Sequence, residues 1–204
     1  MDATVTDWNP THNNFFACAP KFRSVHTSQI QLLRDLPSSV REVSFSSHKA
    51  RSYDSDATQL HVAAELGKKL SSITPHLTTL VLIGAQTRSA AEPRYGKYDR
   101  LISRLRDVQH LVVPAFAVTS LSTSLKSLAY LTRVEIYNGG TYGSDDLARL
   151  LEDILQLVVA STALKQLVVD VDIVEDWDDL DRQTLEQTAQ QHNVQLIVAG
   201  EGAD

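Results

Sequence analysis

A short pattern of apolar residues, apolar-x-x-apolar-x-apolar, recurs along the chain and constrains its fold more than any other feature. Five copies are clear and a sixth is weaker; they begin at Val40, Leu77, Val108, Leu131, Leu164 and Asn193. The intervals between copies are 37, 31, 23, 33 and 29 residues. A degenerate copy, Phe22-x-x-Val25-x-Thr27, precedes the first by 18 residues. A strand-like pattern that returns at such intervals is typical of stacked units rather than of one globular core.

Amphipathic segments lie between the copies and predict helices. Their apolar residues follow i, i+3, i+4 spacing over residues 29–36, 57–73, 99–106, 120–131, 144–160 and, more weakly, 181–191. The segment 144–160 has the strongest signal, because Ser144 can cap its start and acidic residues follow. We therefore expect an α/β fold, with a parallel sheet on one face, helices on the other, and right-handed crossovers between strands.

The charge of the chain is unevenly distributed along its 204 residues. Residues 1–133 carry 16 Lys and Arg against 10 Asp and Glu, whereas residues 134–204 carry 3 against 15. In a solenoid, sequence order is spatial order, so this asymmetry predicts a charge dipole along the long axis that can steer a partner. Cys18 is the only cysteine, and neither a signal peptide nor a membrane span is visible. We expect an intracellular protein, cytoplasmic or nuclear, that has no membrane partner.

The repeats resemble leucine-rich repeats of the long, irregular kind. The stretches Leu36-Pro-Ser-Ser-Val-Arg-Glu-Val-Ser-Phe and Thr74-Pro-His-Leu-Thr-Thr-Leu-Val-Leu look like the repeats of fungal F-box-like proteins, as does the stretch that begins at Cys18. The resemblance implies a leucine-rich-repeat-like solenoid of six to seven irregular repeats over residues 15–204. Residues 1–14 are polar and lack periodicity, so we expect a separate N-terminal segment there. It departs from the family in two respects: no asparagine ladder follows the strands, and nothing before Phe15 resembles an F-box.

Three local stretches of the sequence are candidate binding sites. The acidic run from Asp170 to Asp181 does not have the spacing of an EF-hand; it suits either a solvated loop that leads into a helix or a basic peptide partner. The basic stretch 88–106, which contains Tyr95 and Tyr98, is diluted by acidic residues, so we do not expect nucleic acid to bind. The glycine-rich turn 138–144 lacks the lysine of a P-loop and is read as a flexible turn.

Neither catalytic nor metal-ligating residues emerge from the sequence. The seven histidines form no HxH or HxxxH pair, and Gly-x-Ser-x-Gly does not occur. We therefore expect a non-enzymatic module without a cofactor that binds another protein through a few buried anchors. The candidate partner-binding residues are aromatic or acidic and lie on strands, just after them or in loops: Tyr95, Phe116, Tyr137, Tyr142, Asp172, Glu175, Asp176 and Trp177. Phe116 and Tyr137 suit the core equally well.

The sequence is also compatible with two other functions. One is the substrate-recognition region of an F-box-type ubiquitin-ligase receptor. The other is a small α/β enzyme with a doubly wound sheet, in which the turn 138–144 would hold a phosphate and the strand order would reverse. The last predicted strand, residues 194–198, would expose an apolar edge, so we also expect further C-terminal sequence, an edge-to-edge dimer or a frayed end.

Overall fold

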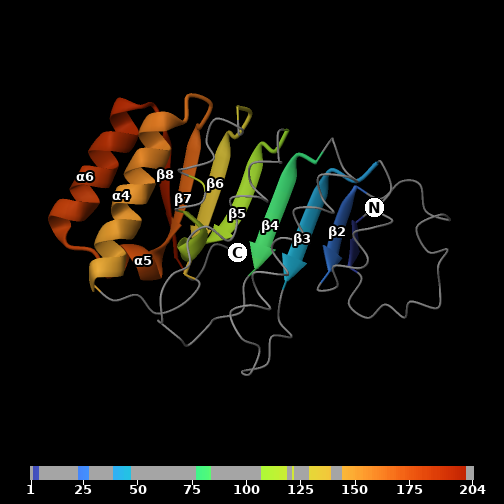
Figure 1. The fold of residues 1–204 in the computed structure, drawn as a ribbon, viewed down its shortest axis with the longest axis horizontal. Coiled ribbons are helices and arrows are strands. Elements are labelled where there is room, and N and C mark those ends of the chain that lie inside the picture. The colour runs from blue at the N-terminus through green and yellow to red at the C-terminus, as the bar shows by residue number, and fades with distance from the viewer. Residues whose placement is uncertain are drawn as a thin grey trace, which may run out of the picture.

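A computed structural model of the chain describes residues 2–4, 23–27, 39–46, 77–83, 107–118, 121, 129–138 and 144–200. Within these ranges, eight parallel strands form one sheet (Figure 1). The strands are β1 (Asp2–Thr4), β2 (Ser24–Thr27), β3 (Glu42–Ser46), β4 (Thr79–Ile83), β5 (His110–Pro114), β6 (Arg133–Tyr137), β7 (Gln166–Asp170) and β8 (Gln195–Ala199). The described helices are the short η3 (Ala115–Ala117), then α4 (Ser144–Ala160), α5 (Val171–Glu175) and α6 (Asp179–Gln191).

The strands lie in the sheet in the same order as in the chain, from β1 to β8. The predicted α/β class with a single parallel sheet is confirmed. The doubly wound alternative is wrong, because that fold reverses its strand order at a switch point and these eight strands show no reversal. The closed turns of a solenoid and their right-handed crossovers stay predictions, since most of the connecting segments lie outside the described residues.

The register of the sheet follows the sequence repeat. In each copy, the residue that precedes the second apolar position pairs with the equivalent residue of the copy on the neighbouring strand. These paired residues are Ser24, Glu42, Thr79, His110, Arg133, Gln166 and Gln195. They are separated by the same intervals as the sequence pattern, so the register of the sheet coincides with the repeat. Asp2 of β1 pairs with Ser24 in the same row, although no pattern within residues 1–14 predicts a strand.

A recurring backbone contact fixes each strand against the one before it. The carbonyl oxygen just before a strand accepts two N–H groups from the next unit, as when Gln109 O accepts from Thr132 N at 2.8 Å and Arg133 N at 3.0 Å. Arg23, Arg41, Thr78 and Thr132 do the same at their own positions. The connections between strands differ in length, yet the strands from β3 to β7 each enter the sheet through the same two bonds. The last step differs, since Lys165 O accepts only from Gln195 N.

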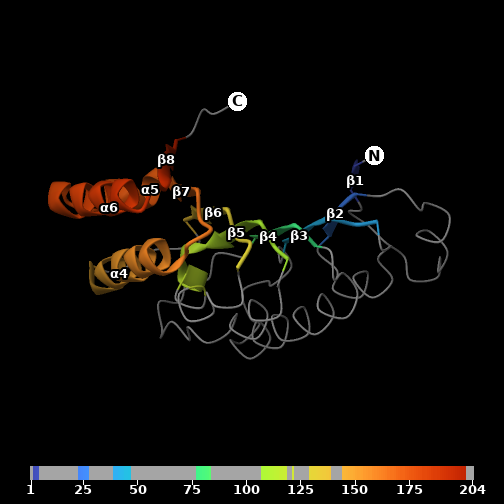
Figure 2. The ribbon, with the colours of Figure 1, turned by 90° about the horizontal axis from the view of Figure 1, so that it is seen from above.

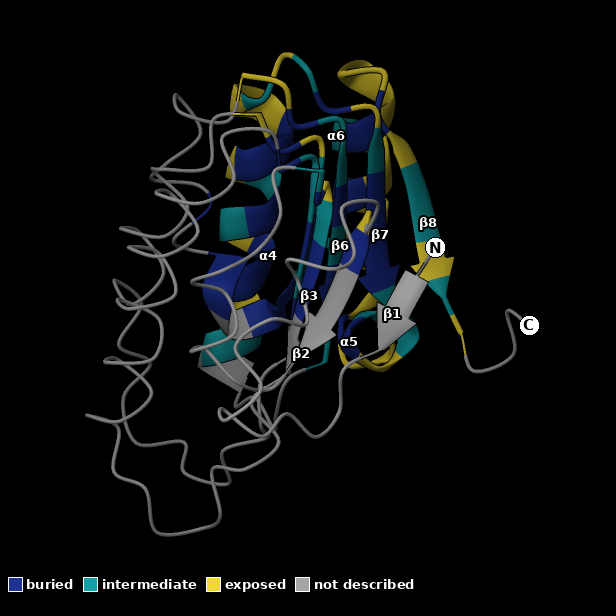
Figure 3. Cartoon of the chain, turned by 90° about the vertical axis from the view of Figure 1, so that its right-hand side faces the viewer, coloured by how far each residue is buried: buried dark blue, intermediate teal, exposed yellow. Residues whose placement is uncertain are grey.

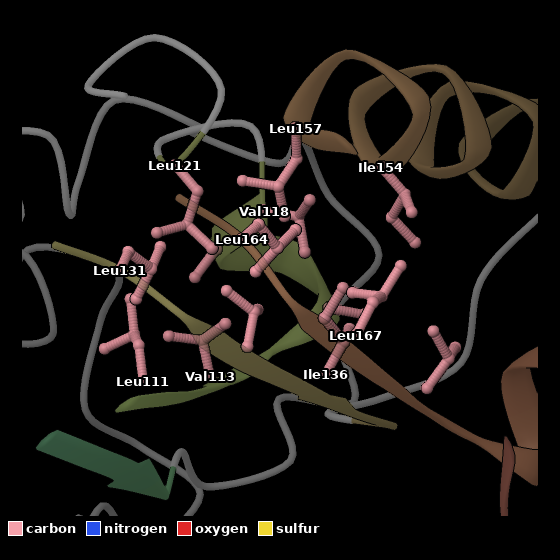
Figure 4. Packing of buried hydrophobic residues seen from close by; sticks show 14 of the residues in the cluster. Leu111, Val113, Val118, Leu121, Leu131, Ile136, Ile154, Leu157, Leu164 and Leu167 are labelled. Atoms are coloured by element: carbon pink, nitrogen blue, oxygen red, sulfur yellow. The ribbon is translucent and has the colours of Figure 1, made fainter. Parts of the chain in front are cut away.

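The repeated apolar positions form the core. The first, second and third apolar residues of each clear copy are at most 4% exposed wherever their side chains are described, and Val43, Leu80, Leu111, Val134 and Leu167 are completely buried. Figure 4 shows these rows from β5, β6 and β7 packed against Val118, Leu121, Ile154 and Leu157. Burial of one such side chain contributes about 1.5–3 kcal/mol, so every copy of the repeat adds to the stability of the fold.

The helices lie on one face of a curved sheet. In Figure 2, β1 and β8 turn toward the same side, and α4 and α6 lie side by side against the opposite, convex face near β7 and β8. The predicted helix 144–160 is confirmed at both ends, although Ser144 is its first helical residue rather than a flanking cap. Helix α6 begins two residues earlier than predicted, because the Asp178 carboxylate accepts the Asp181 N–H at 2.8 Å and caps it. The helices predicted over 29–36, 57–73, 99–106 and most of 120–131 lie outside the described residues.

The weak sixth copy of the repeat has a structural reason. Asn193 adopts a left-handed conformation with φ of 56°, just beyond the end of α6. Its N–H donates to Gln190 O at 3.1 Å and the Val194 N–H donates to Ala189 O at 2.8 Å, which are the two bonds of a Schellman motif. Val194, only 5% exposed, supplies the apolar contact to Ala189 that accompanies this motif. The apolar position has therefore moved from residue 193 to residue 194.

Candidate interaction surface

The concave side of the sheet, which we call the open face, carries the side chains that alternate with the core residues. Such alternation is the ordinary consequence of strand geometry. No described helix lies over this face (Figure 2). Its first row consists of the polar residues that pair across successive strands, from Ser24 on β2 to Gln195 on β8. Its second row, in register, contains Val81, Val112, Glu135, Val168 and Ile197.

Four strands of the open face are joined by a continuous series of side-chain hydrogen bonds. Glu135 Oε1 lies 2.6 Å from His110 Nε2 and 2.8 Å from Arg133 Nε. Arg133 Nη1 donates to Gln166 Oε1 at 3.1 Å, and Gln166 Nε2 donates to Gln195 Oε1 at 3.0 Å. We call these five residues the polar chain. Because each member is held by a neighbour on an adjacent strand, the polar chain is a preformed array of donors and acceptors.

Glu135 occupies an unusual place in the second row. The register sets it directly between Val112 and Val168, so this carboxylate interrupts the apolar part of the row, from Val81 to Ile197. Its side chain is 28% exposed, which leaves it partly desolvated. Arg133 donates to the carboxylate, and an ionised carboxylate only accepts, so His110 donates to it as well. Both bonds use Oε1, and Oε2 has no partner among the described residues.

Two shallow grooves run along the amino-terminal edge of the sheet. The first, about 390 Å³, lies where β4 to β8 begin and includes His110, Arg133 and Lys165 among its lining residues. The second, about 780 Å³, is formed by the segments that precede the strands and includes Tyr130, Lys165 and His192. The side chain of Tyr130 is 61% exposed. Both grooves share Gln109, Thr132 and Lys165, so they form one continuous edge of amides, hydroxyls and basic groups.

The candidate residue Tyr137 lies at the end of β6, and its hydroxyl is engaged within the protein. It donates to Leu82 O on β4 at 2.7 Å and so crosses β5. The parallel ladder between β4 and β5 would bring this carbonyl to the backbone nitrogen of residue 114, since Thr78 O accepts from His110 N four residues earlier on each strand. Residue 114 is proline and has no N–H to donate. The Tyr137 hydroxyl therefore satisfies a carbonyl that Pro114 leaves without a ladder partner.

Trp177 requires a correction. The sequence favours a partner-binding anchor at this position, but the residue is only 4% exposed and belongs to the core. Its Nε1–H donates to Leu147 O on α4 at 3.4 Å, so the indole joins α4 to the segment between α5 and α6. A partner protein has almost no access to this ring.

The three acidic candidates, Asp172, Glu175 and Asp176, are exposed on α5 and at its end. Two other carboxylates of the acidic run serve the backbone: Asp170 caps α5 by accepting the Asp172 N–H at 3.2 Å, and Asp178 caps α6. Across the described residues, no three histidine, cysteine or acidic side chains are grouped so as to hold a metal ion.

The other predicted anchors lie outside what the structure describes. Tyr95 and Tyr142 are not described, and of Phe116 only its place in η3 is known. The basic stretch 88–106 also lies outside the described residues, and so does the turn 138–144 except for Asn138 and Ser144. None of the described helices is both long and apolar enough to cross a lipid bilayer.

Sequence reasoning missed the polar chain, although one signal for it was present. Its members do not form local motifs, because His110, Arg133, Gln166 and Gln195 come from different copies of the repeat. Superposing the copies would have shown a polar residue before the second apolar position in every one. Glu135 would then have stood out as a carboxylate between the valines of the neighbouring copies, Val112 and Val168.

The comparisons with known proteins give little guidance. No protein-family model matches the chain, and no curated protein matches it. Among solved structures, it is similar to the leucine-rich repeat-containing protein LegL7 from Legionella pneumophila, with 15% identity and a TM-score of 0.38. That similarity covers 100% of this chain and 92% of LegL7.

Proposed function

We propose that this chain is a non-catalytic protein-interaction module whose open face binds another protein. The observation that carries the proposal is the polar chain, in which Glu135 lies between Val112 and Val168 and is held by His110 and Arg133. A valine at this position would match both of its neighbours, so the charge has no evident role in packing. Removal of a carboxylate from water carries a desolvation cost that nearby donors only partly offset.

The surface has the composition of a binding site for a protein. Val112 and Ile197 are partly exposed on the second row and offer apolar contact. Glu135 Oε2 offers an acceptor, and the Arg133 guanidinium has more N–H groups than its two bonds use. Apolar contacts beside charged groups that are already oriented are typical of interface hot spots, since little conformational freedom remains to be lost on binding.

The leucine-rich-repeat-like solenoid forms part of this proposal. It is supported by strands in chain order, by the constant register and by the repeated carbonyl contact. An intracellular location, cytoplasmic or nuclear, stays part of it as well. The F-box-type receptor is a narrower version, in which the same face would select a substrate of a ubiquitin ligase. Enrichment of cullin-ligase adaptor subunits with the captured chain would support this version.

The test compares partners of matched variants. The wild-type chain, Glu135→Val and Glu152→Gln would be tagged and captured from cell extract, and bound proteins quantified by mass spectrometry. Glu152 is exposed on α4, against the opposite face of the sheet, and serves as the control. We expect a partner that is retained by Glu152→Gln and lost with Glu135→Val, while neither variant melts below the wild type. Identical partners for both variants would refute binding through the open face.

A further inference from the structure

Among the described residues, the strand β8 lies at one edge of the sheet. It pairs only with β7, and among the described residues no strand lies on its other side. The Gln195 N–H donates to Lys165 O of the β7 unit, so alternation directs the backbone groups of residues 195, 197 and 199 toward β7. The N–H and C=O groups of Leu196 and Val198 then point to the free edge. These four groups are spaced as an added strand requires.

The side chains of β8 are also incompletely covered. Val198 is 46% exposed, whereas Val169, its partner in register, is completely buried. Figure 3 shows the same contrast, with β8 largely teal and yellow beside the dark blue of β7. The strand carries neither a charge, a proline nor a bulge, which are the usual devices that protect an edge from pairing. Its pairing with β7 extends along all five residues, so it is not frayed.

The surroundings of this edge are acidic. Helix α5 contacts β8, and the exposed residues Asp172, Glu175 and Asp176 lie on it or at its end. The only basic residue between Asp170 and Gln191 is Arg182. Its guanidinium donates to Trp177 O and Glu175 O at 3.1 Å each, so it is held against the backbone. The carboxylates beside β8 therefore lack a cationic side chain within this part of the chain.

We propose that β8 takes up an extended, basic segment of another protein as a ninth strand. The backbone of Leu196 and Val198 supplies the hydrogen bonds, and the exposed aliphatic surface of β8 accepts alternate apolar side chains of the added segment. Basic residues of that segment face Asp172, Glu175 and Asp176. A second copy of this chain fits less well, because it would bring together two halves with 15 acidic and 3 basic residues each.

Amide hydrogen exchange measured by NMR tests this assignment at single residues. The probe is the synthetic peptide Lys-Val-Thr-Val-Thr-Val-Lys, and its control is the same sequence with glutamate in place of both lysines. In the free protein we expect fast exchange at Leu196 and Val198 and slow exchange at Ile197, whose N–H is bonded to β7. The basic peptide should protect Leu196 and Val198, whereas the acidic control should leave them unprotected.

Two variants separate the backbone from the charges. Val198→Pro removes a free N–H without breaking a bond to β7, so it should abolish peptide binding while β7 stays paired. The triple variant Asp172→Asn, Glu175→Gln, Asp176→Asn should weaken binding by about tenfold and reduce its salt dependence, since screening acts on charges within about 8–10 Å. The triple variant decides the question on its own where Val198→Pro fails to fold.

Three results would overturn the proposal. The first is protection of Leu196 and Val198 in the free protein together with a dimer in analytical ultracentrifugation, because a second copy would then occupy the edge. The second is equal binding of the basic and the acidic peptide. The third is fast exchange at both residues in the presence of excess basic peptide.

Discussion

The Tyr137 hydroxyl donates a 2.7 Å hydrogen bond to the backbone carbonyl of Leu82, which lies on a strand that does not neighbour its own. The intervening strand β5 ends in Pro114, which is paired with Tyr137 in register. Pro114 has no N–H with which to continue the hydrogen-bond ladder between β4 and β5, and the Tyr137 hydroxyl donates to the Leu82 carbonyl instead. An aromatic residue that looks like a surface anchor in the sequence thus completes the hydrogen bonding of the sheet.

Tyr137→Phe should destabilise the protein by about 1–3 kcal/mol, because it leaves the partly buried Leu82 carbonyl without a donor. The free energy of unfolding, measured with urea, checks this expectation. Tyr130→Phe is the matched control: this residue is 61% exposed and should lose almost nothing. Equal stability of the two variants would contradict the role assigned to the bond.

Pro114→Ala provides a second test of the same relationship, because it restores an N–H opposite Leu82 O. In this background Tyr137→Phe should cost clearly less than in the wild type. The double-mutant cycle measures the difference directly. A cost that is the same in both backgrounds would show that the proline is not the reason for the bond.

Glu135→Val should leave the free energy of unfolding unchanged or raise it by up to about 1 kcal/mol, since a β-branched residue would pack between Val112 and Val168. A carboxylate kept for binding is expected to contribute little to stability. Urea denaturation of this variant beside Glu152→Gln measures the effect. A loss of several kcal/mol would instead assign Glu135 a structural role.

Leu111→Ala should destabilise the protein by about 2–5 kcal/mol, as is usual for a completely buried leucine. Leu196→Ala, at the corresponding position of the edge strand β8, should cost about 1 kcal/mol because that side chain is only partly covered. Urea denaturation of the two variants gives the comparison. Similar losses would mean that the edge of the sheet is as well packed as its centre.

Asn193→Ala should cost about 1 kcal/mol, since alanine is strained at φ of 56°, whereas Asn193→Gly should be neutral or stabilising. Thermal melts of the two variants and the wild type test this order. If alanine and glycine were equally tolerated, the left-handed conformation would not be limiting.

The arrangement of strands could be predicted from the sequence because it depends on one local pattern. Leu80, Leu111, Val134 and Leu167 occupy the same place in successive copies, and register follows when each is set beside the next. The helix over 144–160 was equally accessible, since its apolar stripe and acidic start are both local. The strand β1 was not, because residues 2–4 offer no pattern and depend on β2 as a partner.

The candidate site was harder to predict, because its contacts join residues far apart in the chain. Glu135 meets His110 from 25 residues away, and Tyr137 meets Leu82 from 55. Trp177 lies in an acidic run whose composition indicates solvent, yet it is buried through a contact with α4, 30 residues earlier. Composition averages over neighbours in sequence, whereas burial depends on neighbours in space.

The chain order of the strands has a mechanical consequence. Because each strand pairs only with those that precede and follow it, tension applied to the two ends would detach them one after another rather than shear the sheet as a whole. Each detachment would release the length of chain that separates two successive strands. Beyond β1, a single-molecule extension trace would therefore show steps of 18, 37, 31, 23, 33 and 29 residues, the spacing of the register.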